Sequence, residues 1–399
     1  MYRFILETYH RLIGELPPLK VRYLYASFHL RNRLTGLIGS RGVGKTTLML
    51  QYIKNHLYNE GKTFYFTADH VYFHETTLLE FVSDLYRHEG YQVIFIDEVH
   101  KYHNWNQELK NIYDSFPSLK IVFSGSSMLD LVKGSYDLSR RAVLFHLQGL
   151  SFREYLNFVC DLDLEVVPLQ TALKDSNSIV EVPRMLTHFH DYLKNGYYPF
   201  VFEDAHSYYE KLTRVIDKAI FEDIANYYNL KTPNLHYFKK ILTYLASIPP
   251  GEVNIHNLAQ NLGIDDKTAD HYLGILVSVG LAREIYPSGG GGHRIRKPSK
   301  IFLNNTTLMH TLQQYLQLPI PKGTERELFF IQSLQDAGIE IFYSNEGDFC
   351  TKEAIFEVGG KNKTRRQLKQ VQSPAYLVKD DILTPLKGEI PLFMAGFGY

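Results

Sequence analysis

The sequence contains little cysteine, has no net charge and has no long apolar run. Cys160 and Cys350 are far apart, which excludes a disulfide framework and a zinc site built on paired cysteines and fits a reducing cytoplasm. The 43 basic and 43 acidic residues cancel, so any nucleic-acid contact must come from a local patch. No run approaches the ~18 apolar residues of a membrane span, and the first residues do not resemble a signal peptide. We expect a cytoplasmic protein with no membrane partner.

One glycine-rich segment carries most of the functional information. It follows an apolar run at 34–38, precedes a helix-compatible run, and fits the pattern GxxxxGK[ST] through Gly39, Ser40, Arg41, Gly42, Val43, Gly44, Lys45 and Thr46. Glycines let backbone N–H groups turn inward around phosphate oxygens, and the helix start adds a partial positive charge. We expect ATP to bind here, with Lys45 at the β- and γ-phosphates, Thr46 on Mg²⁺ and Thr47 as a further nucleotide contact.

A second apolar run, at 91–96, ends in Asp97 and Glu98. A continuous apolar run of this length is typical of a strand buried on both faces of a parallel sheet. Ligands bind at the carboxyl ends of such strands. Asp97 is therefore predicted to hold Mg²⁺ through water, and Glu98 to polarise the water that attacks the γ-phosphate.

A third run, at 119–124, ends in small hydroxyl residues. A hydroxyl at this strand tip would lie beside the metal carboxylates and could sense the γ-phosphate or the attacking water. Ser124 is the first candidate and Ser126 the second. A small-residue turn into a following helix explains the same pattern equally well.

Together with Leu-Ser-Arg-Arg-Ala and the block Leu-Ser-Phe-Arg-Glu-Tyr-Leu at 150–156, these motifs resemble a large family of prokaryotic AAA-type ATPases. The resemblance implies four parts in order: a AAA core, a helical segment with Gly-Gly-x-Pro, a winged helix and a restriction-endonuclease-like tail. Arg141 matches the family's arginine, which implies an arginine finger acting in its own or a neighbouring subunit. Pairing of Arg141 with a surface carboxylate is the alternative.

The middle of the chain departs from the family pattern at one glycine, which is Tyr197 here. The resemblance implies that Tyr198 and Pro199 contact the adenine base, although a simple helix-breaking turn fits them as well. Acidic residues crowd the start of the second helix of the predicted winged helix, which favours a structural role over DNA reading. Its wing carries the candidate nucleic-acid contacts Arg294, Ile295, Arg296 and Lys297.

In the tail, the resemblance places a metal site at Glu327, Asp348 and Glu357. Gly359 stands where the endonuclease pattern has its lysine, so either Lys361 reaches in or the site is inactive. We expect a degenerate site. The basic run from Lys361 to Lys369 is either a solvated face or a phosphate-backbone contact.

The predicted fold is α/β: a P-loop NTPase core of the AAA type with a parallel sheet, then a helical lid, a winged helix and a small α/β endonuclease-like domain. The expected domains are residues 1–160, with an N-terminal helix ended by Pro17 and Pro18, then 183–234, 235–305 and 320–399. The predicted function is ATP binding and hydrolysis as a nucleotide-dependent switch. The alternative is a DNA-binding or DNA-cleaving effector regulated by ATP. Either a homo-oligomer or a protein partner remains open.

Overall fold

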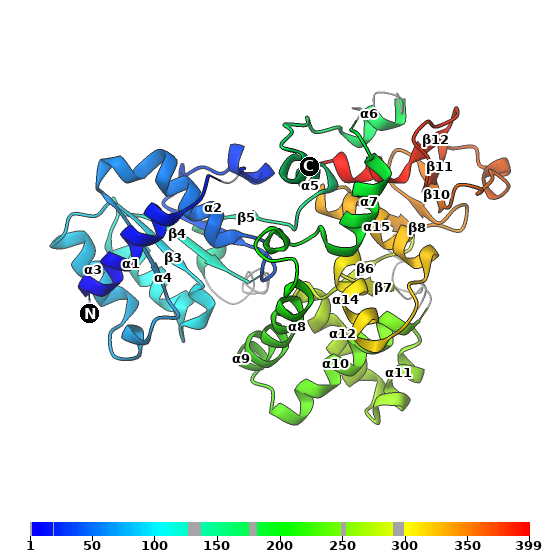
Figure 1. The fold of residues 1–399 in the computed structure, drawn as a ribbon. Helices are drawn as coiled ribbons and strands as arrows, with labels where there is room; N and C mark the ends of the chain where they lie inside the picture. Colours follow the sequence, from blue (N-terminus) through cyan, green and yellow to red (C-terminus); the bar gives the residue numbers. More distant parts are fainter. Residues whose placement is uncertain (1, 19, 127–136, 175–181, 249–252, 290–298) are drawn as a thin grey trace. The chain divides into compact units, whose positions relative to one another are not determined.

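The computed structural model describes the chain except for residues 1, 19, 127–136, 175–181, 249–252 and 290–298 (Figure 1). It divides into two compact units, Met1–Gln148 and Gly149–Tyr399. The division after Gln148 places the Leu-Ser-Phe-Arg-Glu block in the second unit, whereas the sequence had suggested an ATP-binding core that extends to residue 160.

Unit 1 is built on a parallel five-stranded sheet with the strand order β2-β3-β4-β1-β5. The central strand β1 is buried at every residue, and β3 and β4 at every residue after the first, because helices cover both faces of the sheet (Figure 1). The elements of this unit are β1 (Leu34–Ile38), β2 (Thr63–Thr67), β3 (Val93–Asp97), β4 (Lys120–Gly125), β5 (Ala142–His146), α2 (Lys45–Tyr52), α3 (Leu78–Arg87) and α4 (Trp105–Ser115).

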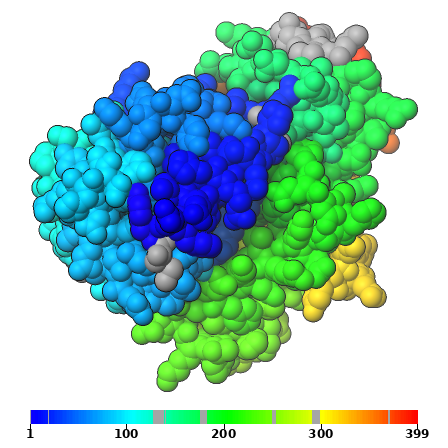
Figure 2. Space-filling view, turned by 60° about the vertical axis from the view of Figure 1, so that its left-hand side comes forward, coloured from blue at the N-terminus to red at the C-terminus, as the bar shows by residue number. Residues whose placement is uncertain are grey.

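The predicted N-terminal helix is confirmed as α1 (Tyr2–Glu15), which ends just before the two prolines. It buries Ile5, Tyr9 and Ile13, which recur every four residues and so lie on one face. Tyr9 packs against Phe64 and Tyr65 of β2. Figure 2 shows α1, in dark blue, on the surface of unit 1.

Unit 2 begins with helices, and its first helix explains the Leu-Ser-Phe-Arg-Glu block. Ser151 caps α5 (Phe152–Cys160) by accepting from the Glu154 N–H, and the Glu154 carboxylate accepts from the Ser151 N–H in return. This reciprocal capping satisfies two N–H groups that a helix start leaves unpaired. Phe152 is fully buried. The block is therefore a helix start in the core of unit 2. The next helices are α6 (Leu169–Lys174), α7 (Met185–Asn195), α8 (Tyr208–Lys218) and α9 (Ala225–Tyr228).

The following elements have the order predicted for a winged helix: α10 (Thr232–Ser247), α11 (Ile255–Leu262), α12 (Asp266–Ser278) and the antiparallel strands β6 (Ala282–Ile285) and β7 (Lys300–Leu303). Gly263, with φ +67°, ends α11 in the left-handed conformation that glycine favours. Asp265 caps α12 through the Thr268 N–H, which gives one of the acidic residues a structural role. The predicted wing contacts from Arg294 to Lys297 lie outside the described residues.

The C-terminal part packs helix α15 (Lys322–Asp336) on a mixed five-stranded sheet with the order β12-β11-β10-β9-β8. Its strands are β8 (Phe342–Tyr343), β9 (Phe349–Cys350), β10 (Ile355–Gly359), β11 (Ala375–Lys379) and β12 (Glu389–Pro391). β10 pairs antiparallel with β9 and parallel with β11. Helix α14 (Thr306–Leu316) joins this part to the preceding strands.

Candidate nucleotide site

Three of the predicted site segments meet at one edge of the unit 1 sheet. Ile38, at the end of β1, lies opposite Gly125 of β4, and Leu37 lies opposite Ser124. β4 also pairs with β3, which ends at Asp97. Because all of these strands are parallel, the glycine-rich loop, the two carboxylates and the hydroxyl strand tip lie at the carboxyl edge, where open α/β sheets bind ligands.

The backbone of the glycine-rich loop has the geometry that a phosphate cradle needs. Gly42 and Gly44 have φ values of 82° and 97°, a region that side chains disfavour. At Gly39 an added Cβ would lie 2.2 Å from the Leu147 carbonyl oxygen. α2 begins directly after the loop, so its unpaired N–H groups and partial positive charge face the same place. These residues fit a nucleotide phosphate.

Lys45 and Thr46 begin α2. The Lys45 side chain is only 6% exposed, and its Nζ donates to the carbonyls of Gly39 and Ser40 at 2.9 and 3.1 Å. The Thr46 hydroxyl donates to Asp97 Oδ2 at 2.7 Å. The two predicted Mg²⁺ ligands, which are 51 residues apart in sequence, are thus already in contact.

Asp97 is the most completely hydrogen-bonded carboxylate of the site. Oδ1 accepts from the Ser124 hydroxyl and from the Glu98 N–H at 3.0 Å, and Oδ2 accepts from Thr46 and from the Tyr65 hydroxyl at 2.8 Å. Burial, and then the Asp97 charge, raises the pKa of Tyr65 well above its usual value, so Tyr65 stays a donor. Donors on both oxygens fix the orientation of Asp97.

Glu98 has an uncommon backbone conformation. Its φ is +52°, which costs energy for a residue with a side chain and persists only where the surroundings impose it. Here its N–H is held by both Asp97 and the Ser124 Oγ at 3.0 Å. The Glu98 side chain is 25% exposed, and its Oε2 lies 3.5 Å from His100 Nε2. With its backbone in this conformation, the Glu98 carboxylate lies beside His100.

Of the two sensor candidates, Ser124 is fully buried and bonded to Asp97 and to the Glu98 N–H. In this position it orients the Asp97 carboxylate and holds the backbone of Glu98. Ser126 is 5% exposed, and its hydroxyl has no hydrogen-bond partner among the described residues. Sensing of the γ-phosphate by either serine stays a prediction.

Arg141 lies at the opposite end of the sheet from the glycine-rich loop. It directly precedes β5, whose first residue, Ala142, pairs with Leu34, the first residue of β1. The loop follows the other end of β1, about 15 Å away along five strand residues. Arg141 bonds to Asp114 at 3.2 and 3.3 Å instead. The described geometry does not bring Arg141 to the loop of its own unit. Action as an arginine finger, in its own or a neighbouring subunit, stays a prediction.

Tyr198 and Pro199 belong to unit 2. Tyr198 is 2% exposed, and its hydroxyl accepts a hydrogen bond from Asn305 at 3.1 Å. Pro199 begins a short 3₁₀ helix, Pro199–Phe202, as a helix-breaking turn would. The Tyr198 ring is thus part of the unit 2 core, and its predicted contact with the adenine base stays a prediction.

The tail corrects the expectation about its lysine. Lys361 is exposed, whereas Lys363 Nζ lies 2.6 Å from Glu357 Oε1. A turn closed by the Lys363 N–H on the Gly360 carbonyl brings Lys363 back over β10. Gly359 makes room for it, since an added Cβ there would lie 2.7 Å from Lys363 Cγ.

The acidic residues of the tail surround Lys363. Burial and the Asp348 charge raise the pKa of Glu327 to about 7. Burial also raises the pKa of Glu357, which is fully buried. Burial lowers the pKa of Lys363, but the Glu357 carboxylate outweighs it and the net shift is upward. Asp348 accepts from the Val358 N–H. In the basic run that follows, Arg365 and Arg366 are exposed, and nothing is described of the Lys369 side chain.

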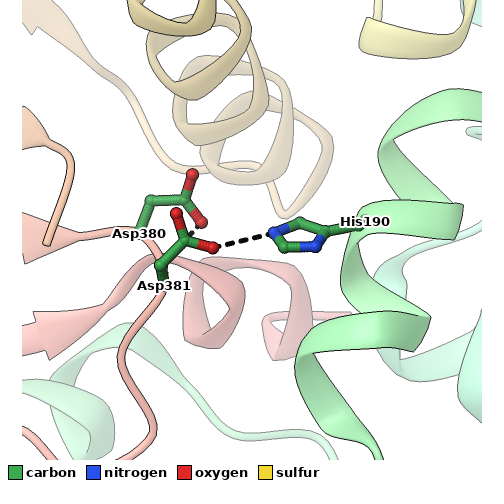
Figure 3. Close-up of side chains that lie close together, drawn as sticks. All are labelled: His190, Asp380 and Asp381. Atoms are coloured by element: carbon green, nitrogen blue, oxygen red, sulfur yellow. Dashed lines mark hydrogen bonds and ion pairs between the residues drawn. The ribbon is translucent and has the colours of Figure 1, made fainter.

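Among the described residues, only His190, Asp380 and Asp381 bring three ligand atoms within 4.8 Å of one another (Figure 3). His190 Nε2 lies 2.9 Å from Asp381 Oδ1. Arg326 Nε donates to Asp380 Oδ2 at 2.8 Å and so already offsets part of the negative charge. This cluster is an ion-pair network that links α7 to the C-terminal sheet.

With this geometry in place, two segments match known families. Residues 31–156 match a family described as an AAA domain, and residues 186–319 match a domain of unknown function. A search of the curated proteins finds no match. Across the described part of the chain, no helix has both the length and the apolar character needed to cross a membrane.

Three solved structures resemble the chain distantly. AMPPCP-bound DnaA from Aquifex aeolicus is 15% identical (68% of this chain, 86% of that chain, TM-score 0.28). A DNA replication initiation factor is 17% identical (68% and 86%, TM-score 0.27). The S. cerevisiae Hsp104–ADP complex is 13% identical (83% and 55%, TM-score 0.31). At these TM-scores the likeness carries no inference about this chain. The family match and the parallel sheet together define the fold as α/β, a P-loop NTPase core of the AAA type.

Sequence reasoning missed Tyr65 and Arg22. Tyr65 sits on an aromatic strand, and its polar end could have been noticed as a neighbour of Asp97, since β2 pairs with β3. Arg22 is 5% exposed and donates to the Val43 carbonyl at 2.6 Å. No motif marks Arg22, because its role depends on how the segment after α1 crosses the loop.

Proposed function

We propose that the chain binds ATP with Mg²⁺ and hydrolyses it, and that hydrolysis switches the state of the rest of the molecule. The observation that carries the proposal is the Asp97 network, which joins the loop threonine, the strand-tip serine and the Glu98 backbone. Each residue has one task. Lys45 and the loop N–H groups would hold the phosphates, and Thr46 and Asp97 would hold Mg²⁺. Glu98 would orient and deprotonate the attacking water.

Mg²⁺, when bound, would neutralise charge that develops on the phosphate oxygens. The protein supplies mainly positioning and electrostatics, because phosphoryl transfer needs little covalent help from side chains. Turnover by the isolated protein is therefore expected to be slow, as suits a switch.

The test separates binding from hydrolysis. Lys45→Ala should abolish binding of a fluorescent ATP analogue, since it removes a buried cation from the cradle. Lys62→Ala, an exposed lysine of the same unit, is the matched control. Near-wild-type affinity in Lys45→Ala would overturn the phosphate-loop assignment.

Glu98→Gln keeps the shape of the side chain and loses its basicity. It should bind ATP normally and hydrolyse it about 10²-fold more slowly or worse. Exposed Glu75→Gln is its control. Phosphate release at the wild-type rate would move the general base elsewhere. The switch is tested by hydrogen exchange in unit 2 of Glu98→Gln with ATP and with ADP. If hydrogen exchange in unit 2 is the same with ATP and with ADP, the protein is an ATPase whose nucleotide state does not alter unit 2, and the switch proposal is wrong.

One observation favours the second candidate, an ATP-regulated DNA-cleaving effector. Lys363 contacts Glu357 and so supplies the cation that the motif at Gly359 lacks. A divalent cation would offset the buried charge of Glu327, Asp348 and Glu357. However, in the described part of the chain their oxygens do not approach within 4.8 Å as a group, so the side chains would have to move to share an ion.

Supercoiled, linear and single-stranded DNA incubated with Mg²⁺ or Mn²⁺ would decide between the candidates. Cleavage that Lys363→Ala and Asp348→Ala abolish, and that exposed Lys361→Ala retains, would favour the nuclease. No cleavage by the wild type would agree with the degenerate site expected from the sequence, and the tail would then serve as a binding surface.

A further inference from the structure

The segment directly before the sheet contacts both the glycine-rich loop and the point where the chain leaves unit 1. Arg22 Nη1 donates to the Val43 carbonyl at 2.6 Å, and its Nη2 donates to the Gln148 carbonyl at 2.8 Å. Val43 is inside the loop, and Gln148 is the last residue of unit 1. The guanidinium is buried, so two carbonyls far apart in sequence share one desolvated cation.

Tyr23, the neighbour of Arg22, bonds to residues 146–148, the exit segment through which the chain leaves unit 1. Its hydroxyl donates to the His146 carbonyl at 2.9 Å and accepts from the Gln148 N–H at 3.2 Å. Residues 146–148 are thus bound on both sides of Leu147 by one pair of adjacent side chains, the Arg22–Tyr23 bridge.

The exit segment also touches the start of the loop directly. The Leu147 N–H donates to the Ile38 carbonyl at 2.8 Å. The Leu147 carbonyl lies so close to Gly39 that a Cβ there would be 2.2 Å from its oxygen. The loop and the exit segment are therefore packed without slack at Gly39 and bridged by Arg22 at Val43. A change in the loop backbone cannot leave residues 146–148 where they were.

We propose that Arg22 is a positioning residue that couples the phosphate loop to the chain's exit from unit 1 at Gln148. The coupling to nucleotide rests on the proposed function, whereas the bridge itself does not. Phosphate that orders the loop N–H groups also fixes the Val43 carbonyl, and through Arg22 it fixes Gln148. By linkage, a force on the exit segment changes nucleotide affinity by the same free energy. Arg22 thus adds a side-chain link, beside the direct contacts of Leu147, through which the ATP state reaches Gln148, the last residue of unit 1.

Arg22→Lys is the informative variant because it keeps the charge, while an ammonium lacks the rigid fork that reaches two carbonyls at once. Tyr23→Phe removes the second half of the bridge with little change in shape. Exposed Arg31→Lys is the matched control. Thermal melting of each variant checks that the fold is kept.

The measurement is hydrogen exchange of peptides covering residues 146–150, with and without ATP, beside titration of the fluorescent ATP analogue. Without nucleotide, Arg22→Lys and Tyr23→Phe should exchange about tenfold faster than wild type at this segment. ATP should slow exchange there in wild type and Arg31→Lys, and much less in Arg22→Lys. The affinity of Arg22→Lys for the analogue should fall by about tenfold.

Lys45→Ala separates this proposal from the proposed function. It should lose the response to ATP because it binds no nucleotide, whereas the effect of Arg22→Lys on exchange at 146–150 is already present without nucleotide. If the wild type does not bind ATP, the comparison without nucleotide still tests the bridge. Exchange in Arg22→Lys equal to wild type under both conditions would overturn the proposal. So would a full ATP response in Arg22→Lys, because the signal would then reach the exit segment by another route.

Discussion

Among the individual residues of the site, Asp97 is central, because each of its two carboxylate oxygens accepts hydrogen bonds from a different pair of groups. Oδ2 faces Thr46 and Tyr65, and Oδ1 faces Ser124 and the Glu98 N–H. Thr46, the other candidate Mg²⁺ ligand, and the backbone of Glu98, the candidate base, are thus both held by the Asp97 carboxylate. Glu98 keeps its left-handed φ where Asp97 and Ser124 hold its N–H.

Ser124→Ala tests this organisation. The change removes a donor to Asp97 and an acceptor for the Glu98 N–H, so both carboxylates lose orientation. We expect kcat for ATP hydrolysis to fall by about 10- to 100-fold, as for other groups that orient metal ligands, with nearly unchanged affinity for ATP. Steady-state hydrolysis and analogue titration measure the two quantities.

Ser126→Ala is the matched control, since its hydroxyl has no hydrogen-bond partner in the described structure. A larger loss of hydrolysis in Ser126→Ala than in Ser124→Ala would assign the sensing role to Ser126. Equal, wild-type rates in both variants would contradict a role for the strand tip.

At the scale of the element, the two units each contain a helix with a reciprocal capping box, at Thr77 before α3 and at Ser151 before α5. The Ser151 hydroxyl also donates to the Tyr399 carbonyl at 2.8 Å and is buried. Replacing Thr77 or Ser151 with alanine therefore removes the same kind of helix cap, in unit 1 in the first case and in unit 2 in the second.

Ser151→Ala should destabilise unit 2 by about 2 kcal/mol, because it loses the cap and the buried hydrogen bond to Tyr399. Thr77→Ala should destabilise unit 1 by about 1 kcal/mol. The single tryptophan, Trp105, lies in unit 1, so its fluorescence during urea unfolding follows that unit while circular dichroism follows both. Because ATP stabilises only what it binds, added ATP should offset the loss in Thr77→Ala and leave that in Ser151→Ala. The reverse pattern would place the nucleotide in unit 2.

The elements also show what the sequence could predict. Strands that end in polar residues were predictable. A continuous apolar run predicts a buried strand, and in a parallel sheet the carboxyl ends of the strands meet at the edge where ligands bind. The candidate site residues at 39–46, 97 and 124 follow from that rule. Lys363 and Arg22 do not, because each acts after a turn or crossing whose direction no local pattern encodes. Gly359 is an example. In the sequence it stands where the endonuclease pattern has a lysine, whereas in the structure its lack of a side chain leaves the space that Lys363 fills.

At the scale of the whole molecule, Arg141 raises the question of assembly. It lies at the amino end of β5 and pairs with Asp114, so in its own subunit it is remote from the phosphates. From this position, action on the nucleotide of a neighbouring copy is the prediction to test. The cost of releasing Arg141 from Asp114 is small, because that carboxylate is about half exposed.

If Arg141 acts between copies, hydrolysis per subunit should rise with protein concentration, and Arg141→Ala should remove that rise. The loss at high concentration should be of the order of 10³-fold, the range known for arginine fingers. Asp114→Asn, which breaks the ion pair and keeps the arginine, should retain the rise.

The decisive measurement mixes Arg141→Ala with Glu98→Gln. The first has an intact nucleotide site and no finger, and the second binds ATP and still offers Arg141. Activity of the mixture well above the sum of its parts would require a finger from one copy at the nucleotide of another. Arg141→Ala that hydrolyses ATP at the wild-type rate at every concentration would reduce Arg141 to a surface partner of Asp114.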